Sequence, residues 1–201
     1  MRGVVCLLTL LVLKEVPVHP APLPAAQDGF DVGSFMGRWY EAAVVSTCPH
    51  YMQRKRGNPV MVAMELQQIS PEGNFTMTSS SSRNGLCMQT STGYSSTDTP
   101  GRFFHHVARS GADVDSFVVH INYSDFALMI QLSTEKPSGT TTTMAKLFSR
   151  TQSVSPAVLH SFKSLVRQYG LSEADIVNQS KGECVPSEQV PKAITTQPQV
   201  K

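Results

Sequence analysis

Phe35-Met36-Gly37-Arg38-Trp39-Tyr40 holds the single tryptophan of this 201-residue chain and begins the first of eight short segments with strand character. Turn residues such as Ser70-Pro71-Glu72-Gly73 separate these segments. The expected strands cover residues 37–45, 60–68, 74–80, 86–94, 102–108, 116–123, 126–132 and 141–149. Eight strands at this spacing, with no helix between them, predict an all-β fold, either an antiparallel barrel or a sandwich.

One helix is expected after the last strand. Ser155 is a favourable N-cap, Pro156 suits the first helical position, and Gly170 suits the C-terminal stop. Apolar residues from Val158 to Tyr169 recur at helical spacing. We therefore expect one C-terminal α-helix that packs by its apolar stripe.

The N-terminus has the pattern of a secretory signal peptide. Arg2 precedes an apolar run over residues 4–13, which is too short to span a bilayer. We predict a signal peptide over 1–20, a Pro/Ala-rich lead over 21–29, a folded domain over 30–187 and a disordered tail over 188–201. The mature protein is thus expected to be secreted and extracellular, without a membrane span.

Composition and motifs exclude several function classes. The net charge of +2 and the absence of a long Lys/Arg block argue against nucleic-acid binding. The six histidines lack a metal-site spacing, so no metal is predicted. The chain also lacks a Gly-x-Ser-x-Gly elbow, a phosphate loop and a His-Glu-x-x-His motif, so we do not expect an enzyme.

The cysteine count is consistent with an oxidising compartment. Removal of the signal peptide removes Cys6 and leaves Cys48, Cys87 and Cys184, which allows one bridge and one free thiol. Three N-glycosylation sequons agree with export. They begin at Asn74, Asn122 and Asn178.

Three local motifs together resemble the lipocalin family. Gly37-Arg38-Trp39-Tyr40 resembles the first family signature, Asn122-Tyr123-Ser124-Asp125 the second, and Arg150 the third. The resemblance implies an eight-stranded antiparallel up-and-down barrel, closed at one end, with the C-terminal helix packed outside. It also implies that Trp39 closes the narrow end and that Arg150 lies over the indole in a cation–π contact of about 0.5–2 kcal/mol.

Within that family the chain is similar to the alpha-1-microglobulin group over roughly residues 30–189. Ser46-Thr47-Cys48-Pro49 and Gly182-Glu183-Cys184-Val185-Pro186 are among the segments that carry this similarity. It implies a Cys87–Cys184 disulfide. It also implies that Cys48, in the first loop near the barrel mouth, is a reactive thiol, and the basic residues that follow it would favour the thiolate. The alternative is an unpaired cysteine that is capped by a small thiol or linked to a plasma protein.

The resemblance suggests two ligand-binding residues, but at other positions the sequence departs from the group. Lys146 and His120 match group residues, and His120 could either contact the cavity or be a hydrogen-bonded structural histidine. Val107 and Ser133 occupy positions where the group has lysines. These departures count against a reductase activity and a haem site.

The expected function is extracellular binding or scavenging of a small hydrophobic ligand, either haem, a haem-derived compound or a retinoid-like molecule, with no required cofactor. The alternatives are a thiol-dependent reductase or radical scavenger acting through Cys48, and capture of a protein partner by a disulfide. Precursors in this group continue into Kunitz-type inhibitor domains. Only 17 residues follow Cys184 here, so protease inhibition is not expected.

Overall fold

The computed structural model describes residues 23–83, 86–136 and 138–179. The predicted signal peptide (1–20), Cys184 and the predicted tail (188–201) lie outside the described residues. The predicted domain over 30–187 is described as far as residue 179, apart from the short gaps. Among the described helices, none combines the length and the apolar character needed to cross a membrane.

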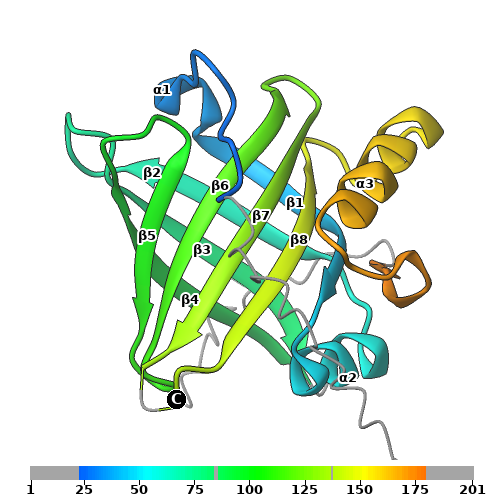
Figure 1. The fold of residues 1–201 in the computed structure, drawn as a ribbon. Helices are drawn as coiled ribbons and strands as arrows, with labels where there is room; N and C mark the ends of the chain where they lie inside the picture. Colours follow the sequence, from blue (N-terminus) through cyan, green and yellow to red (C-terminus); the bar gives the residue numbers. More distant parts are fainter. Residues whose placement is uncertain (1–22, 84–85, 137, 180–201) are drawn as a thin grey trace, which may run out of the picture.

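Eight antiparallel strands close into an up-and-down barrel (Figure 1). Neighbours along the chain pair with one another, and β1 pairs with both β8 and β2, which closes the sheet. The strands are β1 (Gly37–Ser46), β2 (Val62–Gln68), β3 (Phe75–Arg83), β4 (Leu86–Ser96), β5 (Arg102–Val107), β6 (Ala112–Asn122), β7 (Phe126–Glu135) and β8 (Thr141–Ser149). The barrel is thus confirmed and the sandwich excluded.

All eight expected strands are present, and the differences lie at their ends. β3 extends to Arg83, beyond the expected end at Ser80, and β4 extends to Ser96. The serine-rich end of β3 has no apolar alternation to mark it, yet it pairs with β4, for example Ser81 with Met88. Backbone pairing therefore continues where the side-chain pattern stops.

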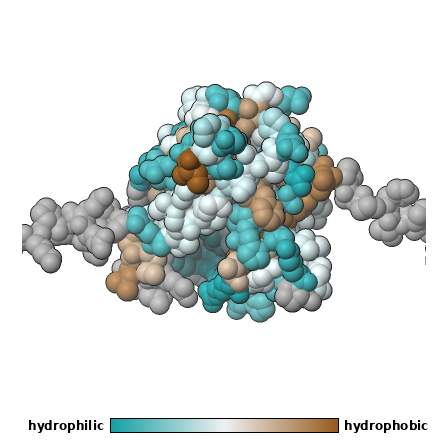
Figure 2. Space-filling view, turned by 90° about the vertical axis from the view of Figure 1, so that its left-hand side faces the viewer, coloured by the Kyte–Doolittle hydropathy of each residue, from teal (hydrophilic) through white to brown (hydrophobic). Residues whose placement is uncertain are grey.

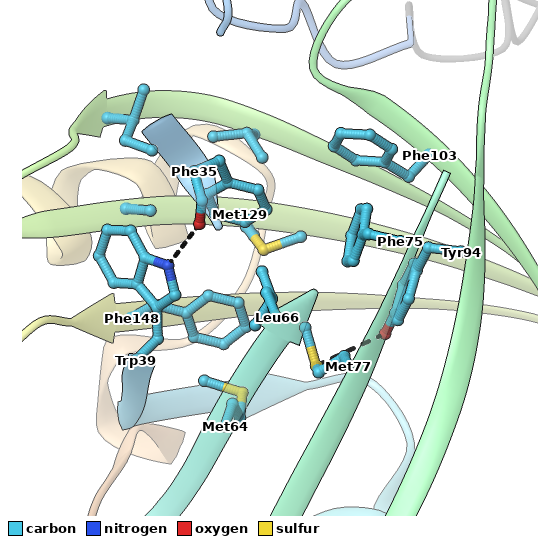
Figure 3. Packing of buried hydrophobic residues seen from close by; sticks show 13 residues of the cluster. Phe35, Trp39, Met64, Leu66, Phe75, Met77, Tyr94, Phe103, Met129 and Phe148 are labelled. Atoms are coloured by element: carbon cyan, nitrogen blue, oxygen red, sulfur yellow. Dashed lines mark hydrogen bonds between the residues drawn. The ribbon is translucent and has the colours of Figure 1, made fainter. Parts of the chain in front are cut away.

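The narrow end of the barrel is packed with apolar side chains (Figure 3). The short helix α1 (Val32–Phe35) covers this end, and Phe35 and Trp39 are fully buried. Aromatic rings meet edge to face, as Phe75 does with Phe103 at 4.9 Å between centroids. This half of the barrel interior is filled.

A second apolar cluster lies outside the barrel, beneath helix α3 (Pro156–Gln168). Ser155 caps the helix because its Oγ accepts a hydrogen bond from the Val158 amide at 3.3 Å. Phe162 is fully buried against strands β7, β8 and β1. The expected C-terminal helix, packed outside, is confirmed.

Four elements were not expected from the sequence, and the short helix α1 is the first of them. Helix α2 (Pro49–Gly57) follows β1, and a 3₁₀ turn (Glu173–Asp175) leads into the short strand β9 (Val177–Asn178), which pairs with β1. Helix α2 has one buried residue, Met52, so it lacks the apolar stripe that would mark it in the sequence. Figure 1 shows α2 at the end of the barrel opposite α1.

Candidate ligand-binding site

A polar layer lies inside the barrel above the packed apolar end. Residues paired directly across antiparallel strands point to the same face of the sheet. Lys146 pairs with Met129, a member of the interior apolar cluster, so Lys146 is directed inward. Gln131 and Ser116 also pair, and Gln131 donates to the Ser116 hydroxyl at 2.9 Å.

Glu41 is the acidic centre of this layer. Its side chain is buried, and its carboxylate contacts two lysines that come from different elements. The Lys55 Nζ of α2 lies 2.5 Å from one oxygen, and the Lys146 Nζ of β8 lies 3.2 Å from the other. Gln179 donates to the same carboxylate at 3.3 Å. The ion pairs of Glu41 with Lys55 and Lys146 therefore connect α2 to the barrel wall.

The lysines keep Glu41 ionised despite its burial. Burial alone would raise the pKa of the carboxyl group, but attraction from Lys146 and Lys55, with their hydrogen bonds, lowers it from 4.5 to about 2. One carboxylate cannot neutralise two ammonium groups. The centre therefore carries an excess positive charge.

Tyr94 and His105 lie together elsewhere in the interior, with ring centroids 4.5 Å apart. Burial raises the pKa of Tyr94 to about 12. Burial, and then the positive charge of Lys146, lowers the pKa of His105 to about 4, so the imidazole is neutral at pH 7. His105 Nδ1 is buried and has no hydrogen-bond partner among the described residues.

The wide end of the barrel is open and partly apolar. Met88 is 50% exposed and pairs with Ser81, and Val107 is 36% exposed and pairs with Ala112. The strand alternation places both on the inner side of the rim. In the space-filling view a recess opens toward the lower end of the barrel, with mostly hydrophilic side chains around it (Figure 2).

A cavity of about 400 Å³ lies under α2 at this end. Its lining comes from α2 and the residue after it, and from β2, β3 and the segment before β2. The lining residues are Tyr51, Arg54, Lys55, Asn58, Val60, Val62, Ser81 and Ser82. Val62 also packs against the interior apolar cluster, so the cavity adjoins the barrel interior.

Cys48 is a free, partly exposed thiol at the N-cap of α2. Its side chain makes no capping hydrogen bond, and its amide donates to the Ser46 hydroxyl at 3.1 Å. The basic residues that follow in sequence are Arg54, Lys55 and Arg56, in the last turn of the helix. At 1.5 Å per residue they begin about 9 Å along the axis from Cys48. The cationic neighbourhood expected from the sequence is therefore not adjacent to the thiol.

His120 faces away from the interior, which contradicts the prediction that it contacts a barrel ligand. It pairs with Leu128, which belongs to the cluster beneath α3. The exposed His120 ring packs against Phe126, and its Nδ1 lies 3.3 Å from the Gln27 side-chain oxygen. A bulge between Val118 and His120 moves the histidine to the outer face.

Trp39 and Arg150 are brought together at the narrow end. The guanidinium lies 3.7 Å from the indole centroid. It also donates to four backbone carbonyls, those of Ser34, Met36, Arg38 and Tyr123. Gly37 has φ +85°, and a Cβ there would lie 3.6 Å from Arg150 Nη1 in a backbone conformation that other residues rarely adopt.

The remaining predicted site residues are dispersed. Asn122 and Asn178 are exposed, whereas the Asn74 side-chain oxygen accepts a hydrogen bond from the Ser96 amide at 2.9 Å. Cys87 is disulfide-bonded, and its expected partner Cys184 lies outside the described residues. The pairing and the glycosylation remain predictions. Within the described ranges, no group of three potential metal ligands occurs.

Glu41, Lys55 and His105 were not predicted from the sequence as residues of the site. A signal for Glu41 was present, because it stands two residues after Trp39 in the same strand and so shares its inward face. No local signal indicated that Lys55 would reach the barrel interior, since it belongs to a helix that was not expected.

Comparisons with known proteins agree with this architecture. Residues 36–183 match the model of the lipocalin / cytosolic fatty-acid binding protein family. Protein AMBP of Pleuronectes platessa is 44% identical over 94% of this chain and 52% of its own length. Protein AMBP of Mus musculus is 32% identical over 94% and 54%. The chain therefore spans about half the length of these relatives.

Two further matches cover nearly whole proteins. Prostaglandin-H2 D-isomerase of Mus musculus is 30% identical over 85% of this chain and 89% of its own length. A solved structure, described as the siderocalin Ex-FABP with dual ligand specificities, superimposes with a TM-score of 0.62. It covers 74% of this chain and 96% of its own at 20% identity, so it shows a shared fold.

Proposed function

Because this chain belongs to the lipocalin / cytosolic fatty-acid binding protein family, whose members bind small hydrophobic ligands, we propose that it is an extracellular carrier or scavenger of such a ligand. The observation that carries the proposal is the division of the barrel interior. The narrow end is packed, whereas the wide end has a partly exposed apolar rim and an adjoining cavity of about 400 Å³. This volume falls within the ~300–1,000 Å³ typical of ligand pockets.

Haem, haem-derived compounds and retinoid-like molecules are the candidate ligands, and no cofactor is required. The extracellular location is supported by the signal-peptide pattern over 1–20, by the disulfide at Cys87 and by the three sequons.

Ligand titration tests this function. Retinol or haemin added to the protein should quench the fluorescence of Trp39, the single tryptophan, in a saturable way. The V107F variant should weaken binding because the larger side chain narrows the mouth. The matched variant H106F should not, because His106 faces outward and contacts Asp113 at 2.7 Å. Binding of neither retinol nor haemin would contradict the proposal.

A second candidate function depends on Cys48. Since the thiol is free and partly exposed, it can act as a reductant or radical trap, or form a disulfide with a plasma protein. C48S should then slow the reduction of haem iron or of a radical dye, and should remove any reducible high-mass band. Rates equal to those of the unmodified protein would eliminate the redox role.

A further inference from the structure

We propose that the protein has a second binding site, outside the barrel at its narrow end, for a small aromatic amine. A cavity of about 180 Å³ lies there between α1 with the segment before it, the turn between β2 and β3, and the loop between β4 and β5. Figure 1 shows this turn and this loop at the end of the barrel that α1 covers. The site is independent of the cavity under α2 at the wide end.

One side of the narrow-end cavity is apolar and aromatic. Phe30 and Phe103 line it with their ring centroids 5.7 Å apart, and Val32 lines it as well. Phe103 belongs to the cluster that fills the narrow end, so packed side chains separate the cavity from the barrel interior. An apolar cavity of ~150 Å³ is large enough to bind benzene. The narrow-end cavity is therefore large enough for one aromatic ring.

The hydroxyl groups around the cavity are available only as hydrogen-bond acceptors. Ser96 Oγ donates its proton to the Glu72 backbone carbonyl at 2.7 Å, and Thr97 Oγ1 donates to the Arg102 carbonyl at 3.1 Å. A hydroxyl has one proton and two lone pairs, so each of these oxygens can offer a lone pair but no proton to a ligand. The site therefore favours a ligand group that donates hydrogen bonds.

The charge at the cavity favours a cation. Glu72 is the one carboxylate among the lining residues, and it is exposed at the rim. Arg102 is the one cation in the lining, and its guanidinium donates twice to Asp115, at 3.0 and 2.8 Å. The charge of Arg102 is thus balanced by Asp115, which leaves Glu72 to pair with a ligand. An ammonium group has three donors and no acceptor, and aromatic rings attract cations. An aromatic amine satisfies all three features.

The test compares three small molecules that share a phenyl ring and differ in charge. Phenethylamine, phenethyl alcohol and hydrocinnamic acid are titrated into the full chain at neutral pH, and binding is followed by ligand-observed NMR. The amine should bind most tightly and the acid least tightly. E72Q should weaken the amine about two- to fivefold, as expected for an exposed ion pair, and leave the alcohol unchanged. E135Q is the matched control, because it removes the same charge at the wide end of β7.

E72K gives a result of opposite sign. A lysine at this position should reverse the preference, so that the acid binds more tightly than the amine, which a general loss of stability would not produce.

The size of the cavity is tested by filling it. V32F should weaken the amine and the alcohol alike, whereas V107F, at the rim of the opposite end, should change neither. Thermal unfolding verifies that each variant is folded, and the Glu72 and Glu135 variants decide the inference if V32F does not fold.

Four results would overturn the inference. They are equal affinities for amine and acid, equal effects of E72Q and E135Q, unchanged amine binding by folded V32F, and loss of amine binding in V107F, which would place the amine inside the barrel. If none of the three molecules binds, the narrow-end site is rejected. The carrier function, which depends on the wide end, is then decided separately by the retinol and haemin titrations.

Discussion

At the scale of single residues, two charges organise the two ends of the barrel, the partly buried Arg150 and the buried Glu41. Arg150 at the narrow end is satisfied by backbone carbonyls and the Trp39 ring, so its charge needs no carboxylate partner. Glu41 at the wide end is satisfied by lysines from α2 and β8. Both charges join segments far apart in the sequence, and each is costly to leave unpaired once its partners are removed.

Replacing Arg150 should destabilise the fold. R150M loses the cation–π contact and the carbonyl hydrogen bonds, and we expect a loss of about 2–4 kcal/mol in the free energy of unfolding. R150K should recover part of this, because an ammonium keeps the charge but not the planar fork. Urea unfolding monitored by Trp39 fluorescence measures both variants. A loss no larger than that of the exposed control R109M would show that the contact contributes little.

Glu41 should make stability depend on pH in the acid range. Its pKa is about 2 when folded and 4.5 ordinarily, so its contribution is complete above pH 4.5 and is lost as the pH falls toward 2. We expect the contribution to be roughly 2–4 kcal/mol at pH 7. The measurement compares urea midpoints of the unmodified protein and E41Q between pH 7 and pH 3. Because the other carboxylates titrate in both proteins, the difference between the two curves of midpoint against pH reports on Glu41. Parallel curves would show that Glu41 does not cause the loss of stability in acid.

At the scale of elements, strand β1 connects the two ends of the molecule. Trp39 and Glu41 face inward, and a bulge after Glu41 turns both Ala42 and Ala43 toward α3. Helix α2 then follows and returns Lys55 to Glu41. One strand therefore contributes to the packed end, the charged layer and the outer helix interface.

The cap of α3 should contribute measurably to this interface. S155A removes the acceptor for the Val158 amide and should lower stability by about 1 kcal/mol, whereas S155D should preserve it. S161A is a suitable control because Ser161 is exposed and its hydroxyl only bonds back to the Ala157 carbonyl. Thermal unfolding gives the comparison, and equal melting temperatures for S155A and S161A would disprove the role of the cap.

At the scale of the whole molecule, hydrogen-bond closure of the sheet leaves the barrel with two unlike ends. One is sealed by α1 and aromatic packing, and the other is bordered by α2, which the Glu41 centre holds in place. For the carrier function proposed above, the wide end is the expected entrance for the ligand. The C-terminal segment follows β9, which pairs with β1 beside that centre.

A Cys87–Cys184 bridge should stabilise the whole molecule. Peptide mapping without reduction should recover these two cysteines linked and Cys48 alkylated. C184A should cost about 2–5 kcal/mol, since the bridge closes a long loop in the unfolded chain. A linkage between Cys48 and either other cysteine would contradict this pairing.

The sequence by itself determined the eight strands, the outer helix with its cap and the all-β class, because alternation, turn residues and helical spacing are properties of neighbouring residues. These patterns left the choice between barrel and sandwich open, and only the family resemblance favoured the barrel. Tertiary structure decided which side chains meet inside. The bulge after Val118 turned His120 outward, and long-range packing brought Lys55 to Glu41 while leaving Cys48 apart from the basic turn. Such contacts depend on strand register and on helices fixed by distant partners, and neither is encoded in a local pattern.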